Sequence, residues 1–102
     1  MIICDEDGGR ARVVLPGALD TAVAAPLKEA LMAALERGLP VVVDASDVSR
    51  LSTACIQVLI AGGRAVADAG RQFIVVRPSE ALVAAFDDMG LFPVMMKWKI
   101  ET

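Results

Sequence analysis

Two short runs of consecutive apolar residues constrain the fold of this chain most. Residues 41–43 are all valine and lead into Asp44, and a second stretch, residues 72–76, is apolar from Phe73 onward. Residues 52–69, between the runs, have the pattern of a helix, and its many small side chains would let it pack closely against a neighbour. Continuous apolar strands are covered on both faces, and a strand–helix–strand order joins parallel strands by a right-handed crossover. We therefore expect an α/β fold with a small, mixed, mostly parallel sheet of four to five strands.

The first fifteen residues indicate an N-terminal hairpin. Residues 2–4 and 10–15 flank an acidic segment that ends in Gly8 and Gly9. Glycine adopts positive φ without steric cost, so a Gly-Gly pair is typical of a tight turn between antiparallel strands. Polar and apolar residues alternate from position 10 onward, which predicts a strand with one solvated face.

Helices are expected to pack against this sheet. The first has Pro26 in or near its first turn and ends at Gly38. The second runs from about position 52 to 69, and the third begins after an N-cap at Ser79. Residues 91–102 contain Pro93, and a short helix and an extended edge segment both stay open there.

Composition bounds the class of protein. The chain has 102 residues, so we expect one domain over positions 1–102. Apolar residues make up 56% of the chain and the formal net charge is −3, which argues against disorder and against nucleic-acid binding. The start of the chain carries no leader pattern, no window is apolar enough to cross a membrane, and the two cysteines have no motif spacing. We expect a cytoplasmic protein with free thiols and no membrane insertion.

The start of the second helix is the candidate functional site. Ser52 and Thr53 place two hydroxyl groups at the positive end of a helix dipole. Asp20 lies in the loop before the first predicted helix, and Asp44 ends the valine strand. One interpretation is an ordinary helix cap made by both hydroxyls. The other is a phosphate-accepting site, since helix N-termini stabilise phosphate by about 0.3–1 kcal/mol. The residues alone do not decide between these two interpretations.

The sequence gives little support for catalysis, metal binding or redox chemistry. The chain has no histidine, which removes histidine-based catalysis and most zinc sites. Asp20 and Asp44 provide too few oxygen ligands for a metal site, and we expect no metal or other cofactor. Cys55 is expected to be a small buried hydrophobic residue, with a redox role as the weaker alternative. No catalytic constellation remains, so we expect a protein that is not an enzyme.

Three motifs resemble the STAS domain, a module of anti-sigma-factor antagonists and sulfate transporters. Residues 17–20 (Gly-Ala-Leu-Asp) resemble the G-x-L-D loop before the first helix of the family. Residues 41–44 resemble its central strand ending in aspartate. Residues 52–55 (Ser-Thr-Ala-Cys) occupy the place of its D-S-S-G signature. The resemblance covers essentially the whole chain and implies the STAS fold.

The signature loop departs from the family at several positions. Ser52 replaces the aspartate, Ala54 replaces the second serine, and Cys55 replaces the glycine. The first serine, which is phosphorylated in the antagonists, corresponds to Thr53. The resemblance therefore implies phosphorylation at Thr53, with Ser52 as the weaker candidate. Loss of the aspartate removes a group that could orient the hydroxyl.

The resemblance implies a protein–protein interaction module of bacterial signalling that phosphorylation at Thr53 turns off. The implied partner is a GHKL-type serine kinase/anti-sigma factor or a chemosensory protein, and the chain would be a monomer or weak dimer. The alternative is a constitutive subunit of an ABC-type lipid transport system, or a chemosensory adaptor, without phosphorylation. The expected partner-binding residues are Asp20, Asp44, Ser52, Thr53, Ala54, Cys55 and Gln57.

Overall fold

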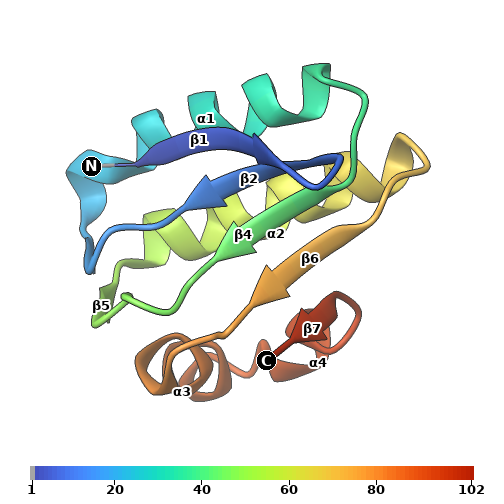
Figure 1. The fold of residues 1–102 in the computed structure, drawn as a ribbon. Coiled ribbons are helices and arrows are strands. Elements are labelled where there is room, and N and C mark those ends of the chain that lie inside the picture. The colour runs from blue at the N-terminus through green and yellow to red at the C-terminus, as the bar shows by residue number, and fades with distance from the viewer. Residues whose placement is uncertain (1) are drawn as a thin grey trace.

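The computed structural model describes residues 2–102 and has a mixed α/β architecture (Figure 1). The strands are β1 (Ile3–Asp7), β2 (Arg10–Val14), β3 (Ala18–Leu19), β4 (Val41–Asp44), β5 (Arg50–Leu51), β6 (Phe73–Val76) and β7 (Lys99–Glu101). The helices are the 3-10 helix η1 (Thr21–Val23), α1 (Ala24–Glu36), α2 (Thr53–Asp68), α3 (Glu80–Asp88) and α4 (Phe92–Met95).

The main sheet has five strands in the order β1-β2-β4-β6-β7. Only the β1–β2 pair is antiparallel; β4 pairs with both β2 and β6 in parallel, and β7 continues the parallel set. The expected mixed, mostly parallel sheet with an N-terminal hairpin is therefore confirmed. Gly8 and Gly9 form the turn with φ of 59° and 78°, conformations that glycine adopts without steric cost.

A second, two-stranded sheet was not expected from the sequence. β3 pairs in parallel with β5, so that Ala18 lies opposite Arg50 and Leu19 opposite Leu51. Each strand has two residues, too few to show a period of hydrophobicity. This small sheet joins the loop before α1 to the loop before α2.

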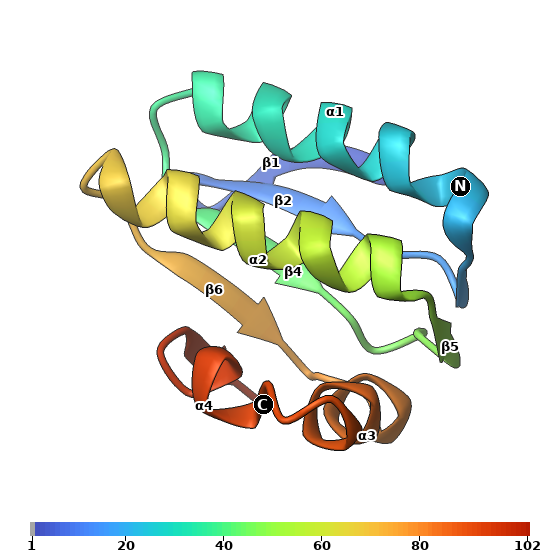
Figure 2. The same ribbon diagram turned by 180° about the vertical axis from the view of Figure 1, so that it is seen from behind.

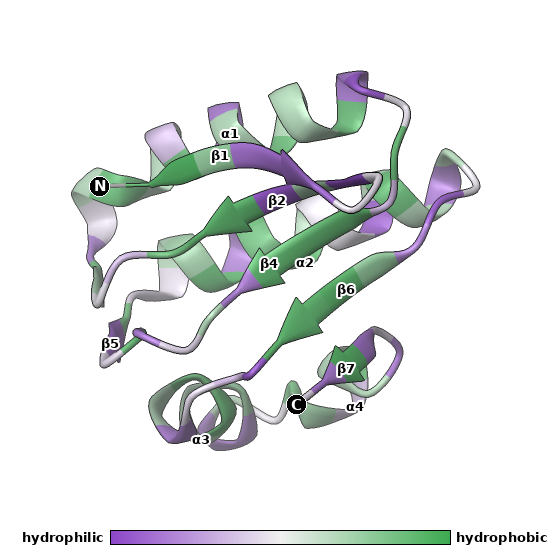
Figure 3. Ribbon diagram, viewed as in Figure 1, coloured by the Kyte–Doolittle hydropathy of each residue, from purple (hydrophilic) through white to green (hydrophobic). Residues whose placement is uncertain are grey.

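The helices cover one face of the main sheet and leave the other open. α1 and α2 lie side by side over the sheet in Figure 2, whereas Figure 1 looks onto the face that carries no helix. α3 and α4 lie beside β6 and β7. Val41 and Val43 belong to the core under the helices, and Val42 lies on the open face because side chains alternate along a strand. The central strands β4 and β6 are hydrophobic over most of their length (Figure 3).

Two adjacent glycines let α2 pack closely on both sides. A Cβ on Gly62 would lie 2.7 Å from Leu31 of α1, and a Cβ on Gly63 would lie 2.7 Å from the indole nitrogen of Trp98. Trp98 in turn packs edge-on against Phe73, with ring centroids 5.0 Å apart. The sequence-based expectation that small residues bring α2 close to its neighbours is confirmed at these two positions.

The C-terminal segment contains both of the structures that the sequence left open. Residues 92–95 form the short helix α4, and β7 then pairs with β6 as an edge strand. Ser79 caps α3 as predicted, accepting a hydrogen bond from the Leu82 amide at 3.1 Å. Among residues 2–102 no helix combines the length and the apolar character that a membrane crossing requires.

Candidate functional site

Ser52 is the N-cap of α2. Its backbone is extended, its Oγ accepts a hydrogen bond from the Cys55 amide at 3.2 Å, and its carbonyl accepts the first helical bond from Ile56 at 3.0 Å. A serine oxygen placed in this way satisfies one of the amide groups that every helix start leaves without a partner. The Ser52 hydroxyl is therefore already engaged as a cap.

Thr53 is the first residue of the helix, and its side chain is exposed. Within residues 2–102 no hydrogen-bond partner is found for its hydroxyl. The expectation that both hydroxyls would cap the helix was thus correct for Ser52 only. Gln57, one turn further along α2, is also exposed, and Ala54 is half-buried. Thr53 is therefore an exposed hydroxyl residue at the positive end of the helix.

The small second sheet brings Asp20 to this helix start. The Ser52 amide donates to the Leu19 carbonyl at 2.8 Å, which extends the β3–β5 pairing to the residue before α2. The Cys55 thiol donates to the carbonyl oxygen of Asp20 at 3.3 Å. Cys55 is fully buried, as expected for a small hydrophobic residue, while Asp20 is exposed. The expectation that Cys55 contacts a partner directly was wrong, because its side chain has no exposed surface. Asp20, Ser52, Thr53 and Cys55 therefore form one continuous site.

A close approach at Gly17 holds the two loops together. Its carbonyl accepts hydrogen bonds from the amides of Ser49 and Arg50, at 2.7 and 3.1 Å, and from the Ser49 hydroxyl at 3.0 Å. A Cβ at Gly17 would lie 3.3 Å from the Asp47 carbonyl oxygen, closer than nearly all such contacts. A glycine at this point lets the loop before α1 meet the loop before α2.

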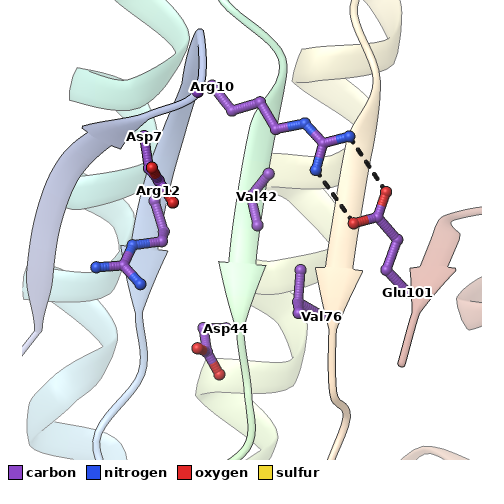
Figure 4. A pocket seen from close by; sticks show the side chains of 8 residues that line it. Asp7, Arg10, Arg12, Val42, Asp44, Val76 and Glu101 are labelled. Carbon is purple, nitrogen blue, oxygen red and sulfur yellow. Dashed lines mark hydrogen bonds and ion pairs between the residues drawn. The ribbon is translucent and has the colours of Figure 1, made fainter.

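Asp44 lies in a different set of contacts. It is 6% exposed, and its carboxylate accepts hydrogen bonds from the amide and hydroxyl of Ser46, at 3.1 and 2.8 Å, and from Arg77. Burial raises the pKa of Asp44, but the hydrogen bonds from Ser46 and Arg77 outweigh burial and hold that pKa below its ordinary value. Its side chain lies on the open face of the sheet beside Val42 and Val76 (Figure 4). No hydrogen bond joins it to Ser52 or Thr53 among the described residues.

Arg77 was not expected from the sequence as the partner of Asp44. The sequence shows only that Asp44 ends one predicted strand and that Arg77 follows another. The structure gives the register, in which Asp44 lies opposite Val76, the residue before Arg77. The ends of neighbouring parallel strands meet at one edge of a sheet, so two charges there are adjacent. Arg77 also has a positive φ of 48°, which is uncommon for a residue other than glycine. Its amide donates to the Glu101 carbonyl, which ties it to β7.

The open face of the sheet carries paired charges. Arg10 extends from β2 across β4 and β6 to Glu101 on β7, with two hydrogen bonds of 3.1 and 3.2 Å (Figure 4). Arg12 binds Asp5 with bonds of 3.0 and 2.9 Å and holds the pKa of that carboxyl below its ordinary value. The shallow hollow between them has a volume of about 400 Å³. Among residues 2–102 no group of three or more Cys, Asp or Glu side chains is arranged to hold a metal ion.

This protein is a mixed α/β domain, as shown by the sheet order, the covering helices and the loop before α2. Comparison with known proteins defines its family. The family described as "Mlab, STAS domain" matches residues 3–93. This chain therefore belongs to the STAS domain family, as the three motifs predicted. No curated protein sequence matches the chain at a significant level.

Solved structures show the same fold at low sequence identity. An anti-sigma factor antagonist from Mycobacterium paratuberculosis has a TM-score of 0.81 at 22% identity, over 99% of this chain and 84% of that one. SpoIIAA in its unphosphorylated form has a TM-score of 0.77 at 11% identity, over 100% of this chain and 88% of that one. The Bacillus SpoIIAA in the phosphorylated form has a TM-score of 0.74 at 15% identity, over 100% and 92%.

Proposed function

We propose that this chain is a non-catalytic protein-interaction module of bacterial signalling, and that phosphorylation of Thr53 ends its interaction. The observation that carries the proposal is the exposed residue Thr53 at the start of α2, beside a Ser52 that already caps the helix. The structural similarity to anti-sigma factor antagonists, one of them in a phosphorylated form, supports the same class of function.

Thr53 is the better phosphate acceptor of the two hydroxyl residues. The Ser52 Oγ accepts the Cys55 amide, so a phosphoryl group on Ser52 would have to replace or rearrange the cap. A phosphoryl group on Thr53 leaves that cap intact. It would also lie near the unpartnered amides of the first helical turn, which stabilise negative charge.

The start of α3 provides an internal comparison. Ser79 caps α3 as Ser52 caps α2, with nearly the same extended backbone, and the next residue is Glu80. A negative side chain at this position is therefore already accommodated in this fold. Phosphorylation of Thr53 needs no refolding of α2, and its effect would fall on whatever docks there.

The expected effect on a partner is electrostatic. A phosphoryl group adds about −1.5 to −2 charges at neutral pH. Asp20 is exposed and its backbone carbonyl contacts Cys55 at this helix start, so a partner that approaches the unmodified site would meet a much more negative surface after modification. We infer that Asp20, Ala54 and Gln57 contribute to the docking surface around Thr53. Asp44, bound to Ser46 and Arg77, would act by holding the loop before α2 in place.

The proposed partner is a GHKL-type serine kinase/anti-sigma factor, or a chemosensory protein that recognises the same surface around Thr53. A docking partner of this kind would act in the cytoplasm, where the chain would work without its own cofactor. The test is incubation of the purified chain with the GHKL-type kinase of the source organism and ATP, followed by intact-mass analysis. The parent chain should gain one phosphoryl group, and Ser52→Ala should gain it too. A phosphoryl adduct that persists in Thr53→Ala would overturn the assignment.

A second candidate function is a constitutive subunit whose docking needs no phosphorylation, such as a STAS component of an ABC-type lipid transport system. The observation that favours it is the altered signature, in which Ser52 replaces the aspartate beside the hydroxyl. Two measurements distinguish the candidates. A constitutive subunit would remain unmodified by the kinase and would bind its partner equally well as the parent and as Thr53→Glu.

A further inference from the structure

An apolar groove runs between α1 and α2 on the side away from the sheet. Its volume is about 630 Å³, and Lys28 is the one charged residue among those that line it. Met32, on its α1 side, is 52% exposed. α2 contributes Ala54 and Gln57 at the end nearest Thr53, so the groove continues directly from the proposed docking site.

The N-terminal part of the outer face of α2 lacks the charge that a solvated helix normally carries. Surface helices usually place charged residues opposite the core. From Thr53 to Gly63 α2 contains no charged residue, and Arg64 and Asp68 are the only two in the whole helix. An apolar and uncharged face on an outer helix is typical of an interaction surface.

The spacing of the groove residues matches a helical occupant. On α2 the row is Ala54, Val58, Ala61 and Ala65, which are spaced by four, three and four residues. This is the a/d spacing by which α1 and α2 themselves pack side by side, and a third helix laid along the groove would meet the same row. Because an α-helix rises about 1.5 Å per residue, the row is about 16 Å long, or three turns.

The facing helix repeats that spacing. Ala24, Lys28, Leu31 and Leu35 of α1 also line the groove at steps of four, three and four residues. Gly62 lets Leu31 approach α2 closely and so keeps the groove shallow rather than closed. Two parallel rows of this kind leave room for a third helix that packs against both.

We propose that the groove docks an amphipathic helix of the partner protein, with apolar residues at heptad spacing and an acidic residue opposite Lys28. The inference rests on the proposed function for the choice of partner and deepens it, since it extends the contact from Thr53 along α2. A second copy of this chain fits less well. Two copies meeting groove to groove would join two concave surfaces and bring two Lys28 side chains together.

The test uses two lactam-bridged helical peptides of about 12–14 residues, a length chosen to span the groove. Both carry leucine at heptad positions, and they differ in one residue, Glu or Lys, placed to face Lys28. Binding to the full chain is followed by the methyl signal of Met32 and by fluorescence anisotropy. The Glu peptide should bind the parent more tightly than the Lys peptide, and Lys28→Glu should reverse this preference.

Two variants distinguish peptide binding in the groove from nonspecific apolar contact. Ala61→Glu, at an exposed groove position, should weaken both peptides at least about tenfold, with an unfolding temperature close to that of the parent. Met96→Glu, at an exposed apolar position on the C-cap of α4, is the matched control and should leave both affinities unchanged. Unchanged binding in Ala61→Glu, or a Met32 signal that does not move, would overturn the proposal.

Sedimentation of the chain alone tests the second-copy alternative. A parent dimer that becomes a monomer in Ala61→Glu would show that another copy fills the groove, and the proposal would be wrong. None of these measurements uses phosphorylated Thr53. A failure of the phosphorylation switch would therefore appear in Thr53 variants, and a failure of the groove would appear in Lys28 and Ala61 variants.

Discussion

Gly63→Ala tests how tightly α2 is packed on the core. A Cβ at this position would lie 2.7 Å from the Trp98 indole nitrogen, 3.1 Å from its Cε2 and 3.2 Å from a ring carbon of Phe73. Trp98 cannot move away freely, because Phe73 and Phe86 pack edge-on against it with centroids 5.0 and 5.6 Å away. The added methyl group therefore forces two packed aromatic rings to shift.

The magnitude follows from two opposing effects. Replacing glycine by alanine inside a helix stabilises it by about 0.8–1 kcal/mol. Overpacking a well-filled core typically costs about 1–3 kcal/mol. For Gly63→Ala we expect a net loss of about 1 kcal/mol, or about 4–8 °C in unfolding temperature for a domain of this size.

The neighbouring glycine is the matched control. A Cβ on Gly62 would meet the Leu31 Cδ1 at 2.7 Å, but that atom is the far end of a flexible side chain beside the open groove between α1 and α2. Gly62→Ala should therefore be neutral or slightly stabilising. The assay is urea unfolding followed by circular dichroism. If Gly63→Ala proves at least as stable as Gly62→Ala, the packing of Trp98 against α2 is not as tight as described.

Three further changes probe the site and the contacts that hold it. Ser52→Ala removes the α2 cap and should lower the free energy of unfolding by about 1 kcal/mol, measured by urea titration; an unchanged value would mean that the cap contributes nothing. Because the pKa of Asp44 is held below its ordinary value, its contribution to stability is present above about pH 4 and lost as the pH falls through the folded-state value. Asp44→Asn should thus lose about 1–3 kcal/mol at pH 7 and respond less to acid than the parent, and parallel stability curves from pH 7 to 2 would contradict this. Thr53→Glu should fold normally and gain about 0.3–1 kcal/mol from the helix dipole, as Glu80 already does at α3; a large destabilisation would refute the comparison of the two helix starts.

The main sheet followed from the sequence because its signals are local. The valine run at 41–43 and the run at 72–76 each identified a buried strand, and Gly8 with Gly9 identified the hairpin turn. Helix starts were equally local, since Ser52 and Ser79 both proved to be caps. These features depend on residues within a few positions of one another.

The contacts that assemble the site could not be predicted in the same way. β3 and β5 have two residues each and pair across about thirty intervening positions, so neither leaves a periodic pattern. Asp44 and Arg77 meet through the register of β4 and β6, which the sequence does not specify. Asp44 accordingly lies on the open face of the sheet, whereas Asp20 reaches the start of α2.

The small residues of α2 have two different roles, and long-range packing decides which residue has which role. Gly62 and Gly63 lie close to Leu31 and Trp98, and Ala61 and Ala65 line the groove together with Gly62. The sequence predicted close packing for the whole set, because helical spacing alone does not say which face a neighbouring helix will cover. The groove between α1 and α2 became apparent only from the structure.

The most direct test of the central claim is the affinity of the partner for three forms of the chain: the parent, the chain phosphorylated at Thr53, and Thr53→Glu. Glu80→Thr is the matched control, because it changes the equivalent charge at the start of α3. We predict tight binding by the parent and by Glu80→Thr, and binding at least about tenfold weaker by the two forms with negative charge at position 53. Equal affinity for the parent and the phosphorylated chain would contradict the account.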